Sequence, residues 1–325
     1  TARMVAHAGQ RAIPLASSSF SFLVPRPPVP LEEIPTVPTT RVSLDGDDWL
    51  LAIDPANQGR DDDWRLRPVQ AAKQAVVPWI IQEAFPGYHG LAWYWRSFQA
   101  PVNPYASGRY VLRFAQVDYL AEVWLNGQPV GGHEGGETPF ELDVTDAIRA
   151  GEENQLAVRV LNPTHERIDG IVLGETPHRC KVMPYGAGAA YNHGGITGSV
   201  ELALTPPVSL SSLWLRPDAD SGRVRVRLRA RNSLAETVTA SVTCTIALDT
   251  AAHSPLGLPV AVERTLSPGD TEVEVWLHVN APKLWDLATP VLYRVTARLQ
   301  ARGLDDEISA RCGFRDFRFR DGAFR

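Results

Sequence analysis

Cysteine, methionine and long apolar runs are all scarce in this chain of 325 residues. Its three cysteines, Cys180, Cys244 and Cys312, are widely spaced and form no C-x-x-C pair, which argues against a zinc knuckle or a disulfide framework. No segment has the length and uniform apolarity of a membrane-spanning helix, so a membrane is not an expected partner. The net charge of −5, with both signs mixed along the chain, predicts no nucleic-acid partner.

Common catalytic motifs are also lacking. The segment His133–Glu137 reads H-E-G-G-E, so the second histidine of a zinc-binding H-E-x-x-H motif is replaced and two glycines would break the required helix. No phosphate-binding G-K-[ST] ending and no G-x-S-x-G elbow are present. The acidic clusters 45–48 and 61–63 lack the twelve-residue spacing of a calcium loop and read as solvated turns. We therefore predict no metal and no cofactor.

The sequence does contain runs in which apolar residues recur at every second position. Tyr110, Leu112 and Phe114 alternate with other residues, as do Leu156, Val158 and Val160, and each run predicts a strand with one buried face. Ala157 and Arg159 are then expected on an exposed face. Asn126-Gly127 is a strong hairpin signal between two such runs. With turn residues about every ten positions, the pattern predicts an all-β protein.

A second region begins after Pro206-Pro207, where a proline pair interrupts strand pairing. About seven short strands follow without a helical pattern, which is typical of an immunoglobulin-like β-sandwich. The clearest of these predicted strands are 223–230, 238–246, 272–279, 293–300 and 307–314. The length of the chain agrees with two domains that each bury a core.

We therefore predict four segments, the first being residues 1–39 as a tail with a proline-rich linker. Residues 40–206 form a first β-sandwich, residues 207–315 form the immunoglobulin-like one, and residues 316–325 begin a further linker. The sequence assigns neither a compartment nor an oligomeric state, and self-association stays open.

Several conspicuous side chains allow two interpretations each. The stripe of Arg225, Arg227 and Arg229 is read as the solvated face of a strand, with a polyanion site as the alternative. Cys244 and Cys312 fall on apolar faces, which favours buried structural thiols over a disulfide or a reactive site. Four aromatic residues of the first domain are read as core packing rather than as sugar-stacking platforms, namely Trp93, Tyr94, Trp95 and Trp124.

One long segment, residues 124–160, carries a family resemblance. It holds a hairpin ending in N-G, then G-x-H-x-G-G, T-P-F, D-V-T and N-x-L-x-V-x-V in order. This segment resembles the sugar-binding domain of glycoside hydrolase family 2, which implies a galactose-binding-like jelly roll. Gly90-Leu91-Ala92-Trp93-Tyr94 upstream and the strand beginning at Gly195-Ile196 downstream resemble the same domain. The second region resembles the family's immunoglobulin-like domain through Leu284-Trp285 and the closing Gly313-Phe314-Arg315.

The resemblance bears on the chemistry expected of the chain. Retaining glycosidases need two carboxyl groups about 5 Å apart, and in this family both are glutamates of a catalytic barrel. That barrel is missing here, so we name no catalytic residue and leave open whether the chain counts as an enzyme. The resemblance also implies an acidic sugar contact about six positions before Gly195, where this sequence has Ala189.

The nearest polar candidates for substrate binding are Tyr191, Asn192 and His193, whose side chains can donate or accept hydrogen bonds. The alternative is that they satisfy backbone groups of their own loop. The preceding long loop, residues 162–191, is expected to reach toward the barrel, and an Arg or Lys within it could meet a uronic acid carboxylate.

Three hypotheses for the whole chain follow. In the first, it is the non-catalytic N-terminal portion of a family 2 glycoside hydrolase that helps to shape the sugar site, with carbohydrate and the barrel of the same polypeptide as partners. In the second, it is a stand-alone carbohydrate-binding module. In the third, it is a structural module without a ligand, because sandwiches host many functions.

Overall fold

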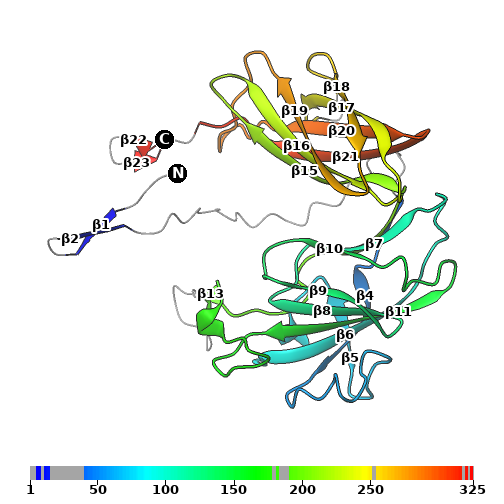
Figure 1. Cartoon of the computed structure of the whole chain (residues 1–325). Coiled ribbons are helices and arrows are strands. Elements are labelled where there is room, and N and C mark those ends of the chain that lie inside the picture. Colours follow the sequence, from blue (N-terminus) through cyan, green and yellow to red (C-terminus); the bar gives the residue numbers. More distant parts are fainter. Residues whose placement is uncertain are drawn as a thin grey trace.

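A computed structural model gives the architecture of the chain. It describes residues 5–8, 11–14, 40–177, 181–182, 190–250, 254–316, 319–320 and 323–324. Within these residues the protein is nearly all β, and Figure 1 shows two successive sandwiches along the chain. The only helical elements described are α1 (Ile81–Ala84) and the short 3-10 helix η1 (Leu173–Glu175).

The first sandwich packs a four-stranded sheet against a six-stranded one. The four-stranded sheet has the order β10-β7-β14-β3, with bounds Phe140–Asp143, Arg109–Phe114, Val200–Thr205 and Thr40–Ser43. The six-stranded sheet has the order β5-β4-β6-β11-β8-β9, with bounds Lys73–Val77, Gly46–Ile53, Gly90–Gln99, Glu153–Asn162, Leu120–Leu125 and Gln128–Glu134. Every pair within these two sheets is antiparallel, as expected for a jelly roll.

The second sandwich contains seven strands. Its three-stranded sheet has the order β15-β16-β19, with bounds Val208–Pro217, Arg223–Asn232 and Gly269–His278. Its four-stranded sheet has the order β18-β17-β20-β21, with bounds Val260–Leu266, Val238–Leu248, Tyr293–Ala301 and Leu304–Cys312. The sequence predicted about seven strands and located five of them, and the structure also places β15 and β18.

Three two-stranded pairs complete the described elements. They are β1 with β2 (Val5–Ala8 and Arg11–Pro14), the parallel pair β12 with β13 (Lys181–Val182 and Ala190–Tyr191), and β22 with β23 (Phe319–Arg320 and Ala323–Phe324).

Each sandwich has a hydrophobic core of its own. Strand β14 ends at Thr205, strand β15 begins at Val208, and the two large clusters of buried residues share no member. These observations support the domain division that we propose, with the boundary between residues 206 and 207.

The turn between β8 and β9 confirms the predicted hairpin. Asn126 and Gly127 have φ angles of 53° and 79°, the left-handed values that a type I′ turn requires at both central positions. Asn126 also donates from its amide to the carbonyl of Ala147, 2.8 Å away, which ties the hairpin to the loop before β11.

The central strands β6 and β11 of the six-stranded sheet are buried on both faces, which corrects one prediction. Ala157 and Arg159 of β11 were expected to face solvent, but they are only 0% and 1% exposed. The loop after β4 lies over this outer face, where Trp64 packs beside Trp93 and Trp95. Because a sheet covered on both sides needs apolar residues at consecutive positions, β6 can bury Trp93, Tyr94 and Trp95 in a row.

The same burial decides between the two interpretations of these aromatic side chains. Trp93, Tyr94 and Trp95 are at most 1% exposed and Trp124 is 8% exposed, so the prediction of core packing is confirmed. Trp93 and Trp124 stack with ring centroids 5.0 Å apart, which leaves neither ring free to bind a sugar.

Candidate functional site

The three predicted substrate-binding residues lie at one end of the six-stranded sheet. Tyr191 ends β13, and Asn192 and His193 follow it in the loop that leads to the Gly195 bridge. Asn162, the last residue of β11, and His89, which directly precedes β6, meet this loop from neighbouring strands. The sequence pattern did not single out His89 or Asn162. Their positions at the same end of two paired strands are the signal that could have found them.

Asn162 is the centre of a buried hydrogen-bond network. Its side-chain oxygen accepts a hydrogen bond from the amide of Gln82 at 3.0 Å and lies 2.9 Å from Nδ1 of His89. Its amide donates to the side-chain oxygen of Asn192 at 3.1 Å and to the carbonyl of His193 at 3.2 Å. Because Asn162 is fully buried, these bonds fix the loop of His193 to the sheet.

The three candidate residues therefore differ in how far their side chains are exposed to a ligand. Asn192 is fully buried, and its amide donates to the carbonyl of Pro163 at 2.7 Å, so its side chain supports the loop from within. His193 is exposed, and Tyr191 is partly exposed. Their rings meet edge to face with centroids 4.8 Å apart.

His89 adds a third ring to this group. Its ring centroid lies 5.5 Å from that of Tyr191, whose hydroxyl is 3.3 Å from Nε2 of His89. Partial desolvation and the positive charge of Lys181 lower the pKa of His193 below its ordinary value, although the charge of Asp118 opposes them. His193 is therefore largely uncharged at neutral pH, where it can donate and accept hydrogen bonds.

A buried ion pair lies beside these rings. Asp118, which pairs with Gly195 through two backbone hydrogen bonds of 2.8 Å, forms a salt bridge with Lys181 of β12. The sequence left open that an Arg or Lys of the long loop could meet a uronic acid carboxylate. Lys181 is instead neutralised by Asp118, while His178 and Arg179 lie outside the described residues, as does Ala189.

The first half of the long loop lines an open depression of about 670 Å³ next to His89. Residues 164–169 form one wall, and residues 54–57 of the loop after β4 form another. Two loops that are distant in sequence thus line the same depression beside the candidate site.

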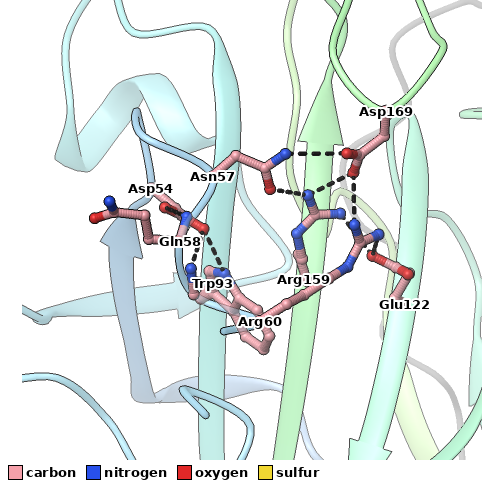
Figure 2. Close-up of polar contacts among 9 residues, drawn as sticks. Asp54, Asn57, Gln58, Arg60, Trp93, Glu122, Arg159 and Asp169 are labelled. Carbon is pink, nitrogen blue, oxygen red and sulfur yellow. Dashed lines mark hydrogen bonds and ion pairs between the residues drawn. The ribbon is translucent and has the colours of Figure 1, made fainter. Parts of the chain in front are cut away.

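Figure 2 shows how Arg159 holds these two loops to the sheet. Its guanidinium donates to Glu122 of β8, to Asp169 and to the side-chain oxygen of Asn57, each at 2.6 Å. Arg60 pairs with the same two carboxylates from the solvent side, at 2.5 and 3.1 Å. The Arg159 side chain is 1% exposed, so its charge is desolvated and depends on these partners.

Asp54 fixes the beginning of the same loop. Its carboxylate accepts hydrogen bonds from the backbone of Gln58 and Gly59, both at 2.9 Å, and from the indole of Trp93 at 3.1 Å. Asp54 is 2% exposed. The wall formed by residues 54–57 is therefore anchored to the sheet at two points, where Asp54 contacts Trp93 and where Asn57 contacts Arg159.

The described residues contain no group of three or more His, Cys, Asp and Glu side chains placed to hold a metal ion. Nor does any helix among them have the length and apolarity to cross a membrane. The described polar groups of the candidate site can form hydrogen bonds with a neutral, hydroxyl-rich ligand.

A jelly roll with such a polar end, followed by an immunoglobulin-like sandwich, is the architecture that the sequence resemblance implies for the non-catalytic modules of a class of glycosidases. The model of the sugar-binding domain of glycosyl hydrolases family 2 matches residues 79–206, and a second family 2 model matches residues 208–315. Together they cover most of the chain. The chain belongs to glycoside hydrolase family 2, and these are its sugar-binding and immunoglobulin-like domains.

Curated relatives agree with this assignment. A β-galactosidase of Aeromonas hydrophila is 26% identical over 321 residues, which cover 88% of this chain and 29% of that protein. A β-glucuronidase of Paenibacillus borealis is 34% identical over 119 residues, covering 35% of this chain and 20% of the relative. The chain thus spans less than a third of the length of these relatives.

Solved structures show the same fold. A family 2 β-glucuronidase superimposes with a TM-score of 0.68 at 19% identity, over 88% of this chain and 31% of that one. A β-galactosidase homologue from Bacteroides fragilis gives a TM-score of 0.67 at 20% identity, over 87% of this chain and 42% of the other. These similarities confirm the predicted all-β architecture of two sandwiches.

Proposed function

We propose that the chain acts as the substrate-shaping portion of a retaining β-glycosidase of the β-galactosidase or β-glucuronidase type. The catalytic carboxylates are then supplied by a barrel of the same polypeptide, and carbohydrate is the ligand. The observation that carries the proposal is the end of the six-stranded sheet, where Tyr191, His193 and His89 stand on the buried Asn162 network. Groups fixed in this way are oriented before a sugar arrives.

Of the three predicted contacts, we propose that Tyr191 and His193 face the ligand and that Asn192 positions them. The hydroxyl of Tyr191 and the neutral ring of His193 match sugar hydroxyls in hydrogen-bonding capacity. Asn192 acts indirectly, because its side chain is enclosed by Asn162 and Pro163.

The gene is read beyond the codon of Arg325 first, and the resulting longer polypeptide is assayed with nitrophenyl β-galactoside and β-glucuronide. We expect hydrolysis of one of them with retention of configuration. Tyr191→Phe and His193→Ala should each raise KM by about five-fold, because each removes about one hydrogen bond worth roughly 1 kcal/mol. A longer polypeptide that hydrolyses neither glycoside, or variants that leave KM unchanged, would contradict the proposal.

The stand-alone alternative makes a different prediction. The 325-residue chain alone would then bind galactose or glucuronate in calorimetry without a barrel, whereas we expect no measurable heat. Light scattering on the same sample gives the molar mass and tests the self-association that the sequence leaves open.

A further inference from the structure

The outer face of the three-stranded sheet carries two exposed tryptophans among arginines. The inward side chains of β16, such as Val224, Val226 and Leu228, belong to the core, so the alternate positions point to solvent. We call this surface the Trp–Arg face. Its members are Ser212, Trp214, Arg216, Arg223, Arg225, Arg227, Arg229, Arg231, Asp270, Glu272, Glu274, Trp276 and His278.

The two tryptophans are placed on either side of β16. Trp214 of β15 lies opposite Arg227, and Trp276 of β19 lies opposite Arg225. Strands about 4.8 Å apart and a rise of about 3.3 Å per residue place their Cα atoms about 12 Å apart on a diagonal. Such a separation matches two rings of an extended polymer rather than one small ligand.

Both indoles are held in place although about half of each is exposed. Trp214 is 49% exposed and Trp276 is 51% exposed. The guanidinium groups of Arg227 and Arg225 lie 5.6 and 5.9 Å from the respective ring centroids. The indole N–H of Trp276 also donates to Glu274 at 3.1 Å. A ring already fixed in this way loses little conformational freedom when a ligand packs on it.

The charge of the Trp–Arg face is opposite to that of the chain. The face has six arginines and three carboxylates, whereas the whole chain has a net charge of −5. Glu274, Glu272 and Asp270 each pair with an arginine. Among the described residues neither Arg216 nor Arg223 forms a salt bridge, although the charge of Arg216 acts on Asp218. Both lie at the end of the face that holds Trp276. Arg216 is in register with Arg225, which is in register with Trp276, and Arg223 lies two residues before Arg225 on β16.

We propose that the Trp–Arg face binds an extended polysaccharide that carries carboxylates. Two of its pyranose rings pack their C–H faces on Trp214 and Trp276, and its carboxylates pair with Arg216 and Arg223. Guanidinium pairs with carboxylate through two parallel hydrogen bonds, which gives this contact a defined geometry. The proposal rests on the carbohydrate role of the chain, but it places a second site on the other domain, away from the Tyr191 end.

The test is affinity electrophoresis of the 325-residue chain in native gels. Carboxymethylcellulose and hydroxyethylcellulose are the two probes, because they share a β-linked backbone and differ in charge. We expect retardation by carboxymethylcellulose alone. Trp214→Ala with Trp276→Ala should weaken it by at least about ten-fold, since the exposed half of each indole offers about 100 Å² of apolar surface. Trp79→Ala, which removes a tryptophan that is 54% exposed in the first domain, is the matched control and should change nothing.

A second variant keeps the proposal testable if removal of both tryptophans unfolds the domain. Arg216→Gln with Arg223→Gln keeps both rings and every ion pair named above, and it should reduce retardation by carboxymethylcellulose. No retardation of the native chain, retardation that survives both double variants, or equal retardation by poly(dT) would each overturn the proposal.

An assay of the longer polypeptide distinguishes the Trp–Arg face from the glycoside site at the Tyr191 end. The Trp214 and Trp276 double variant should leave KM for a nitrophenyl glycoside unchanged while binding to the polymer is lost. Protection of both indoles from N-bromosuccinimide in the longer polypeptide without polymer would show that its own remaining residues cover the face, and that result would also overturn the proposal.

Discussion

Replacing Arg159 with methionine tests whether the buried arginine holds the candidate site together. The variant keeps an unbranched apolar side chain but removes the guanidinium, so that Glu122 and Asp169 lose their buried partner. Removing one member of a buried ion pair costs about 3–5 kcal/mol. We expect the lower end of this range, because Arg60 still contacts both carboxylates from the solvent side.

The matched control is Arg60→Met. Arg60 contacts the same two carboxylates, but its side chain is 39% exposed, so its ion pairs should contribute at most about 1 kcal/mol. The two variants therefore remove the same formal charge from the same cluster and differ in the burial of that charge.

Scanning calorimetry and urea unfolding supply the measurement. A loss of about 3 kcal/mol in a domain of this size lowers Tm by about 6–12 °C. Six of the nine tryptophans precede residue 206, so intrinsic fluorescence follows mainly the first domain. Equal losses for the two variants would refute the reasoning, because burial of Arg159 would then contribute nothing.

The pH dependence of stability gives an independent check on the cluster formed by Arg159, Arg60, Glu122 and Asp169. Burial alone would raise the pKa of Asp169, but hydrogen bonds from Arg159 and Asn57 and the charges of Arg159 and Arg60 lower it overall. A carboxyl with a lowered folded-state pKa stabilises the fold above its unfolded pKa, and this contribution is lost as pH falls through the folded pKa. We expect the native chain to lose stability below about pH 4 more steeply than Arg159→Met does.

Three further predictions concern other parts of the chain. His193 should titrate below pH 6.5 in NMR spectra, and Lys181→Met should move its midpoint upward, since the charge of Lys181 opposes protonation; an unchanged midpoint would contradict this. In a background with Cys180→Ser and Cys312→Ser, Cys244 should resist Ellman's reagent at pH 8 until the fold is lost, because burial raises its pKa to about 12; rapid reaction of the folded chain would be the opposite result. Gly194→Ala should destabilise the first domain by a few kcal/mol, because the new Cβ would lie 2.3 Å from Cβ of Asn162. Gly174→Ala, whose Cβ meets nothing within 4 Å, should be nearly neutral in the same thermal scans.

Much of the fold was predictable because the sequence repeats local patterns. Alternation in residues 223–230 and 238–246 placed β16 and β17, and Asn126-Gly127 placed the β8–β9 turn with its left-handed backbone. These signals depend only on neighbours in sequence. The expected burial of Cys244 was also confirmed, because a cysteine in register with Val242 and Ile246 must share their face.

What sequence reasoning missed depended on contacts between distant segments. Nothing near Arg159 shows that the loop after β4 covers its strand, so alternation alone assigned it to solvent. The covering loop begins at Asp54, and the carboxylate of Asp169 comes from the loop after β11. Three segments must meet before a buried charge at Arg159 is tolerable, and no local pattern encodes that meeting.

The same reasoning separates Asn192 from its neighbours. A polar triplet in a loop looks alike at all three positions, and the sequence alone treated Tyr191, Asn192 and His193 as equivalent. The turn that follows Tyr191 directs Asn192 inward to Asn162 and leaves His193 outside. Asn192 and Asn162 hold the backbone of this loop, so the hydrogen-bonding groups of Tyr191 and His193 keep their positions at the sheet end without help from a ligand. The polar end of the jelly roll is therefore a preformed surface, and a sugar bound there would not have to order the loop first.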